Sequence, residues 1–180
     1  MNAKDCILQR RSVRRFLDQP VKRDTVRQIV DLARFAPSWK NSQIVHYTFV
    51  DDKAVKDHIA DNCVRGFTFN TLNLHSADSL MVISYDTGRS GRNNDGTLQS
   101  EDAEKWEMFD CGVAAQTFCL AARTFEVGTC IIGVVDEDAI HDLLGLPAQR
   151  KVACLIAMGY PVEWKAAPPR HTTDEILSFQ

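Results

Sequence analysis

The sequence lacks most of the local signals that reveal a function directly. No apolar run is followed by the glycine array that holds phosphates in dinucleotide-binding folds or in P-loop proteins. The six cysteines form no CxxC pair and no Cys/His group with the spacing of a zinc site. No apolar run is long enough to cross a bilayer, and the first residues lack the core of a signal peptide. We therefore expect neither common nucleotide-binding fold, no metal site and no membrane span.

An excess of charge of one sign is also missing. Lys and Arg number 21 and Asp and Glu number 24, so the formal net charge is -3 and there is no overall attraction to nucleic acid. Hydrophobic residues make up 44% of the 180 positions, which suits one globular domain over residues 1–180. Most cysteines fall in apolar runs, where a free thiol behaves as a small hydrophobic side chain. This usage favours a reducing, cytoplasmic location.

One basic stretch stands out in this weakly acidic chain. Arg10-Arg11-Ser12-Val13-Arg14-Arg15-Phe16 places four guanidinium groups within six residues. A guanidinium is planar and always charged, and it forks onto phosphate or carboxylate oxygens. Arg170 lies among prolines near the other end of the chain. If the two ends meet, they form one anion site, although the stretch alone favours a solvated charged surface.

Hydrophobic periodicity predicts a mixed α+β fold, with about four strands surrounded by helices. Residues 65–75 show no regular pattern, residues 86–102 form a long polar loop, and the tail after Pro161 is extended. Gly128 is expected to cap the longest helix, whose small residues at 112–117 allow close approach of another element or subunit. The expected helices are Ala3–Gln9, Arg23–Phe35, Asp51–Cys63, Ala103–Glu126 and Glu137–Leu144, and the expected strands are His46–Val50, Ser79–Tyr85, Thr129–Val135 and Val152–Met158.

Three separated segments together resemble the nitroreductase family of FMN-dependent oxidoreductases. The first is the basic stretch from Arg10 to Phe16. The second, Ala36-Pro37-Ser38-Trp39-Lys40-Asn41-Ser42-Gln43, is similar to the family's Ala-Pro-Ser-x-x-Asn-x-Gln loop. The third runs from the long helix through Gly128-Thr129-Cys130-Ile131-Ile132-Gly133 to Gly159-Tyr160-Pro161 and Arg170. The resemblance covers nearly the whole chain in the right order.

The resemblance implies a nitroreductase-like fold, with a central mixed or antiparallel sheet of four or five strands wrapped by helices. It also implies an intertwined homodimer with FMN at the subunit interface. NADH or NADPH would reduce FMN at N5, and an electron-poor acceptor, such as a nitroaromatic or a quinone, would then take the electrons in a ping-pong cycle. No catalytic side chain is expected, because the hydride transfer itself needs no protein acid or base.

The same resemblance assigns roles to individual residues. Residues holding the FMN phosphate and the pyrimidine edge of the flavin would be Arg10, Arg11, Ser12, Arg14 and Arg170. The loop that the second subunit lays over the flavin would contribute Pro37, Ser38, Trp39, Asn41 and Gln43. An amide near the ring would come from Asn70, and the wall near N5 from Ile131, Ile132 and Gly133.

Two alternatives stay open at this level. One keeps the flavin but changes the reaction to that of an FMN-dependent dehalogenase or dehydrogenase. The other is a non-catalytic anion-binding module that uses the basic stretch alone. Trp39 is large where the family often has small residues, and Asn73 stands where some members carry a lysine near the flavin. The choice between NADH and NADPH is not settled by the sequence.

Overall fold

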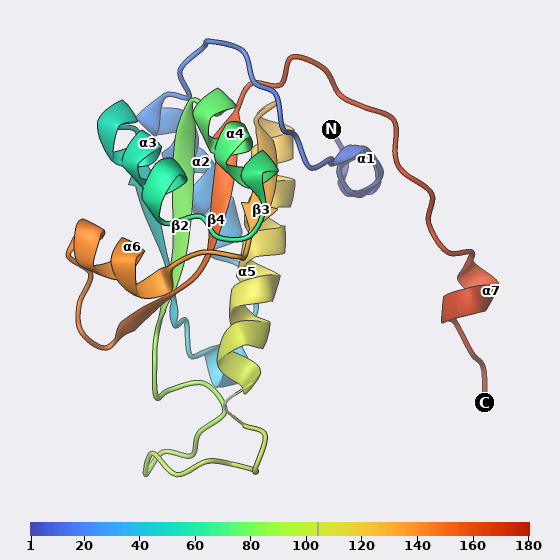
Figure 1. Ribbon diagram of the computed structural model, residues 1–180. Helices are drawn as coiled ribbons and strands as arrows, with labels where there is room; N and C mark the ends of the chain where they lie inside the picture. The colour runs from blue at the N-terminus through green and yellow to red at the C-terminus, as the bar shows by residue number, and fades with distance from the viewer. Residues whose placement is uncertain (104) are drawn as a thin grey trace.

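The computed structural model describes residues 1–103 and 105–180 of the chain. Its centre is a four-stranded, wholly antiparallel sheet with the order β1-β2-β4-β3 (Figure 1). The strands are β1 (Val45–Val50), β2 (Ser79–Asp86), β3 (Gly128–Ile132) and β4 (Arg150–Gly159). The predicted α+β class is confirmed, and the sheet lies at the lower end of the expected strand number.

Helices cover both faces of this sheet, and alternation along the strands builds a core on each side. In β2, Met81 and Ile83 pack into the core shared with α2 and α5. Leu80 and Val82 point the other way, toward α3, α4 and α6. The helices are α1 (Ala3–Gln9), α2 (Arg23–Ala33), α3 (Lys53–Asn62), α4 (Thr68–Ser76), α5 (Lys105–Thr124), α6 (Glu137–Leu144) and α7 (Thr173–Ile176), with one 3₁₀ turn, η1 (Trp39–Asn41).

The expectation that residues 65–75 are irregular was wrong, because α4 occupies most of them. Its sequence lacks amphipathic order, since Phe69 and Leu72 are exposed while the polar Asn73 is buried. Contacts from distant segments hold the helix instead. The Lys56 ammonium donates to the Leu74 carbonyl at 2.7 Å, and the Ser76 hydroxyl accepts from the backbone of the basic stretch at 3.1 Å.

Gly128 does not cap the long helix, which corrects the second local expectation. Helix α5 ends at Thr124, and Glu126 takes the left-handed conformation with φ of 58°. Gly128 is instead the first residue of β3, where a Cβ would lie 2.7 Å from Cγ2 of Val13. A glycine is needed there for close packing against the basic stretch. Glu104, within the predicted long helix, lies outside the described residues.

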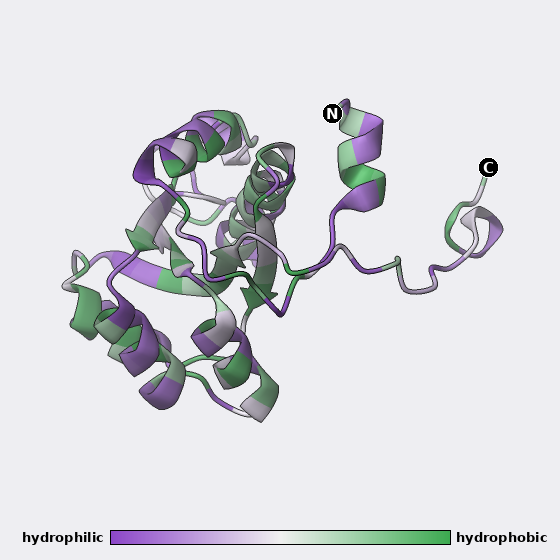
Figure 2. Ribbon diagram, turned by 90° about the horizontal axis from the view of Figure 1, so that it is seen from above, coloured by the Kyte–Doolittle hydropathy of each residue, from purple (hydrophilic) through white to green (hydrophobic). Residues whose placement is uncertain are grey.

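The two ends of the chain differ in how they relate to the packed body. Helix α1 touches the C-terminal half of α5, where the Cys6 thiol donates to the Leu120 carbonyl at 3.1 Å. Its Ile7 is exposed. The tail beyond Pro161 is extended, as expected, and carries α7 well away from the body (Figure 1, Figure 2). No helix in the described part of the chain combines the length and apolar character that a membrane span requires.

Candidate functional site

The basic stretch lies along the free edge of β3 and beside the start of the C-terminal tail. The Val13 amide donates to the Thr129 carbonyl at 2.9 Å, and Ser12 and Thr129 form a parallel bridge. On the tail side, the Val162 amide donates to the Arg15 carbonyl at 3.1 Å. The bonds to β3 pair backbone groups on its free edge that would otherwise be exposed. The basic stretch therefore meets the start of the tail at Val162, but these bonds do not involve Arg170.

The guanidinium groups of this stretch are not neutralised by the protein. Among the described residues, no carboxylate lies within 4.0 Å of Arg10, Arg11, Arg14 or Arg15. Arg11 is engaged instead by backbone carbonyls, including those of Leu8 at 2.7 Å and Lys165 at 3.2 Å, and Arg14 makes only a 3.4 Å bond to the Ser12 carbonyl. A small hollow of about 60 Å³ lies among Arg11, Arg14 and Arg15, and its wall also includes Glu163 and Lys165, whose charged groups are 3.7 Å apart. The donor set is that of an anion site.

Two of these guanidinium groups, those of Arg10 and Arg14, lie close enough to β3 to act on the thiol of Cys130. Burial raises the pKa of the Cys130 thiol, and the positive charges of Arg14 and Arg10 oppose that rise. The outer side of the strand is open, since Ile131 is 47% exposed and Gly133 is exposed. The basic side chains and the open end of β3 thus belong to one surface.

The start of α4 adjoins the same surface. The Arg65 amide donates to the Val134 carbonyl at 3.0 Å, which ties the chain before α4 to the residues after β3. Asn70, in the first turns of α4, is half-buried. Asn73, one turn further on, is 6% exposed, and its side-chain nitrogen has no hydrogen-bond partner among the described residues. We call the set Arg10, Arg11, Ser12, Arg14, Asn70, Ile131, Ile132 and Gly133 the basic half-site.

A second group of predicted residues surrounds a buried carboxylate on α5. Asp110, only 2% exposed, accepts from the Trp39 amide at 3.0 and 3.1 Å. It also accepts from the hydroxyls of Ser42 at 3.3 Å and Ser90 at 2.7 Å. These bonds join the loop after α2 and the long loop after β2 to one point on the helix. We call Pro37, Ser38, Trp39, Asn41 and Gln43 the loop half-site.

The loop half-site has an unusual backbone. Lys40, Asn41 and Gln43 all have positive φ, at 43°, 55° and 50°. Left-handed conformations cost free energy in residues other than glycine, and they persist where surrounding contacts over-determine them. Here the Asp110 bonds and the bond from the Gln43 amide to the Ser38 hydroxyl, at 2.9 Å, supply that constraint. Strain of this kind is typical of functional loops.

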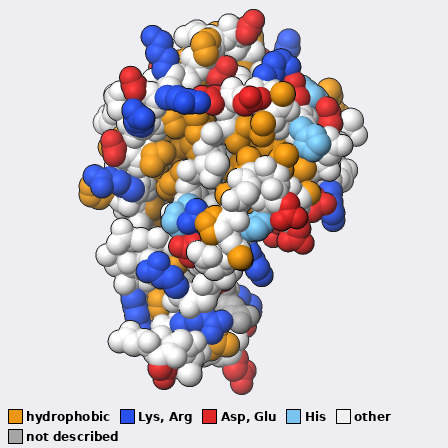
Figure 3. All heavy atoms as spheres, turned by 90° about the vertical axis from the view of Figure 1, so that its left-hand side faces the viewer, with side chains coloured by type: hydrophobic (Ala, Val, Ile, Leu, Met, Phe, Trp, Pro, Cys, Tyr) orange, Lys and Arg blue, Asp and Glu red, His pale blue; other side chains and the backbone are white. Residues whose placement is uncertain are grey.

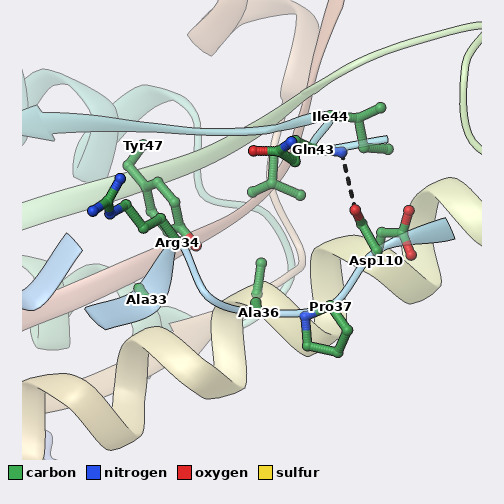
Figure 4. A pocket seen from close by; sticks show the side chains of 11 residues that line it. Ala33, Arg34, Ala36, Pro37, Gln43, Ile44, Tyr47 and Asp110 are labelled. Carbon is green, nitrogen blue, oxygen red and sulfur yellow. Dashed lines mark hydrogen bonds between the residues drawn. The ribbon is translucent and has the colours of Figure 1, made fainter. Parts of the chain in front are cut away.

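Aromatic rings and a cavity border this loop. The Trp39 and Trp106 ring centroids are 4.8 Å apart, and Trp106 meets Phe109 edge-on at 5.1 Å. Figure 4 shows the cavity of about 140 Å³ beneath the loop, between the end of α2, the start of β1 and α5. Tyr47 and Asp110 contribute polar atoms to its walls, and burial raises the pKa of Tyr47 to about 12.

The two half-sites lie at opposite ends of α5. Asp110 is near the beginning of the helix, whereas Thr124, at its end, leads into β3 and the basic stretch. At 1.5 Å per residue, the helix between these two residues spans about 21 Å. The structure therefore brings the predicted residues together in two sets rather than one. Arg170 joins neither: it donates to the carbonyls of Pro168 and Pro169, at 3.0 and 3.1 Å, on the extended tail.

Sequence reasoning missed two residues that organise these sets. Asp110 is an acid between Phe109 and Cys111, next to the apolar and small residues of the helix that follow it, and that position was a usable signal. Arg123, 5% exposed, lies with its guanidinium carbon 4.0 Å from the centroid of the Trp164 ring, where the tail begins. No local pattern marks that contact, since the partners are far apart in the sequence.

Comparison with known proteins decides the family. The sequence profile described as the nitroreductase family matches residues 7–71 and 67–160. The chain belongs to the nitroreductase family. A relative from Archaeoglobus fulgidus, whose name joins NADH dehydrogenase to NAD(P)H nitroreductase, is 28% identical over 163 residues, which cover 88% of this chain and 85% of the relative. The FMN reductase [NAD(P)H] of Bacillus subtilis is 26% identical over 175 residues, 89% of this chain and 66% of that one.

The fold of the nitroreductase family is also found by structural comparison. A nitroreductase family protein from Streptococcus pneumoniae superposes with a TM-score of 0.85 at 21% identity, covering 99% of this chain and 100% of that chain. The likeness at this identity concerns the fold. It confirms that the sheet, its helical layers and the extended tail form a nitroreductase architecture.

Proposed function

We propose that this nitroreductase family protein is a homodimeric, FMN-dependent oxidoreductase that passes electrons from NADH or NADPH to an electron-poor acceptor such as a nitroaromatic or a quinone. The observation that carries the proposal is the unpaired charge of the basic half-site. Arginines that lie beside the open end of β3, with no carboxylate partner in the described chain, match the phosphate and the electron-rich pyrimidine edge of a flavin.

The residues present fit the cofactor on physical grounds. The glycine at position 128 lets Val13 pack against β3, and this packing carries Arg10 and Arg14 to the strand end. The buried side-chain nitrogen of Asn73, which has no partner in the described part of the chain, offers a further donor next to the same surface. When bound there, FMN supplies hydride and electron transfer that no side chain of the protein can provide. The protein's own part is to hold the phosphate and to stabilise negative charge.

A homodimer follows from the separation of the half-sites. One chain cannot bring both ends of α5 to one flavin, but a second copy related by two-fold symmetry can place its loop half-site over the first copy's basic half-site. The exposed stripe of α5 contains Phe109, Gly112 and Gln116, and Gly112 allows close helix approach. The exposed apolar residues of the tail, Ile176 and Phe179, also lack a surface to cover them in their own chain.

All six cysteines are free and buried, which supports a cytoplasmic protein. Burial raises the pKa of both Cys111 and Cys154 to about 12, so neither thiol is poised to react. We therefore assign the redox chemistry to the cofactor rather than to a thiol.

The first test is the absorbance spectrum of the purified protein, before and after addition of FMN, together with its mass by light scattering. We expect a yellow dimer that is bleached anaerobically by NADH or NADPH and recovers with a nitroarene or quinone. Arg14→Gln should weaken FMN binding about tenfold or more, as expected for loss of a charged hydrogen bond. Arg27→Gln, an exposed arginine on α2, is the matched control.

The alternatives predict different results. A non-catalytic anion-binding module would be colourless with added FMN and would bind polyanions with strong salt dependence. A dehalogenase or dehydrogenase of the same family would bind FMN but would not be bleached by either nicotinamide. A colourless monomer would overturn the proposal as a whole.

A further inference from the structure

A surface pocket beside the loop half-site is not used by the function proposed above. It has a volume of about 310 Å³ and lies between the loop after α2 and the long loop after β2. Figure 3 shows basic side chains at this lower end of the molecule, with acidic ones at its tip. We call it the polar-loop pocket; its lining residues are Trp39, Lys40, Ser42, Gly88, Arg89, Arg92, Asn93, Asn94 and Gly96.

We propose that the polar-loop pocket binds the 2′-phosphate end of NADPH, so that NADPH rather than NADH is the preferred electron donor. The inference rests on the proposed function, since it assigns the donor of that reaction. It depends on three features of the pocket: its charge, its aromatic wall and its connection to the loop half-site.

The charge of the pocket is positive. Three of the nine lining residues, Lys40, Arg89 and Arg92, are basic, and none of the nine is acidic. Arg92 donates to the Gly96 carbonyl at 2.9 Å, so the proposal depends on Lys40 and Arg89. Among the described residues, no carboxylate lies within 4.0 Å of Lys40 or Arg89; the Lys40 ammonium donates to the neutral Gln99 amide at 2.9 Å. A phosphate monoester carries close to two negative charges at neutral pH, so such a group gains most from two cations that line one pocket.

Carboxylates near the pocket are already engaged by other groups. Glu107 accepts from the Gly88 amide at 2.7 Å. Asp95 accepts from the Thr97 amide and hydroxyl, at 3.0 and 2.6 Å, and these bonds lower its pKa. Neither lines the pocket, and so the groups that face a ligand there are cations and amides.

The aromatic wall suits an adenine. The Trp39 ring lines the pocket, and the Lys40 ammonium lies 5.5 Å from its centroid. A base stacked on an indole, with a cation next to it, is a recurrent mode of nucleotide recognition that does not depend on hydrogen bonds to the base. A phosphate bound to Arg89 and an adenine against Trp39 are the two ends of one adenosine 2′-phosphate.

The connection to the reaction site is direct. Trp39 and Ser42 line the pocket, and both are held by Asp110 together with Ser90 of the long loop. Because the proposed function places the loop half-site over a flavin, a dinucleotide whose nicotinamide lies on that flavin has its adenosine end near the polar-loop pocket. The long polar loop, which supplies Arg89, would thereby help to determine whether NADPH or NADH is the preferred electron donor.

The test uses the FMN-loaded protein and two probes, 2′,5′-ADP and 5′-AMP, in titration calorimetry. We expect 2′,5′-ADP to bind at least tenfold more tightly, with an affinity that falls as salt is raised. Arg89→Gln and Lys40→Gln should each remove most of that difference, about tenfold, whereas Arg27→Gln on α2 should keep it. Steady-state kinetics should show the same loss in the ratio of kcat/KM for NADPH to that for NADH.

Equal affinity for the two probes would overturn the inference, as would an unchanged probe ratio in Arg89→Gln. A common fall in binding of both probes would also overturn it, because it would assign Arg89 to the pyrophosphate that NADH and NADPH share. These failures leave the flavin spectrum and the bleaching by nicotinamide intact. Failure of the proposed function is recognised separately, by a protein that takes up no FMN.

Discussion

Replacing Gly128 by alanine tests how the basic stretch is held on β3. The added Cβ would lie 2.7, 2.9 and 3.1 Å from Cγ2, Cβ and Cγ1 of Val13, all well inside the ordinary contact of about 3.5–4.0 Å. Val13 is 5% exposed, and a β-branched side chain has few other rotamers. Overpacking of this kind typically costs about 1–3 kcal/mol. We expect Gly128→Ala to lower the free energy of unfolding by that amount.

A double-mutant cycle identifies the cause. Val13→Ala alone should cost roughly 2 kcal/mol through the loss of two buried methyl groups. In the Gly128→Ala background the same change removes two of the three short contacts, although Cβ of residue 13 remains. The two changes should therefore cost at least about 1 kcal/mol less together than the sum of their separate effects.

Urea unfolding of the four proteins gives these free energies, and FMN titration gives the functional consequence. Displacement of Val13 should move Arg14 away from the strand end, so Gly128→Ala should also weaken FMN binding. Strictly additive losses would refute the reasoning. They would show that the cost of Gly128→Ala comes from a contact other than the one with Val13.

The other predictions concern the supports of the two half-sites. Asp110→Leu should lower the free energy of unfolding, measured in urea melts, by about 3 kcal/mol, because several buried donors lose their acceptor. Asp110→Asn should lower it by less. Equal stability of the Asp110→Leu variant and the wild type would contradict this. Hydrogen bonds from neighbouring lysines, first Lys53, hold the pKa of Asp57 well below its ordinary value. Stability should therefore fall as pH drops below about 4, and Asp57→Asn should show a shallower fall in acid unfolding curves. Trp164→Leu should lower the free energy of unfolding by about 1–2 kcal/mol and speed proteolysis of the tail. Trp164→Phe, which keeps a ring over Arg123, should lower it by less. Identical behaviour of the two variants would argue against the cation–π contact.

Local chemistry explains the parts of the fold that could be predicted. Helices α1 and α6 begin where expected, and α3 begins two residues after its expected start. In each, the residue before the helix, Asn2, Asp136 or Asp52, accepts backbone N–H bonds from the first turn. Gly145 ends α6 with φ of 59°, in the left-handed conformation that glycine adopts most easily. Each strand of the sheet is an apolar run in the sequence, so it can be recognised as a strand without knowing which other strands it pairs with. Such signals act over a few residues and are visible in the chain.

The candidate site was predictable only as a set of residues. Motifs in the basic stretch, in the Ala36–Gln43 loop and near β3 indicated the family, and the family profile confirms that. Their division between the two ends of α5 was not predictable, because it depends on the length and packing of a helix that none of the motifs contains.

By itself, the sequence determined the fold class, the N-terminal caps of α1, α3 and α6, and the family motifs, since each depends on neighbouring residues. Only the tertiary structure decided that α4 is a helix, that Gly128 makes room for Val13, and that Asp110 joins two loops. These features arise from contacts between residues far apart in the chain, such as Val13 with Thr129 and Trp39 with Asp110. The free energy of these contacts depends on which surfaces folding brings together, and a pattern of neighbouring residues does not predict which surfaces those are.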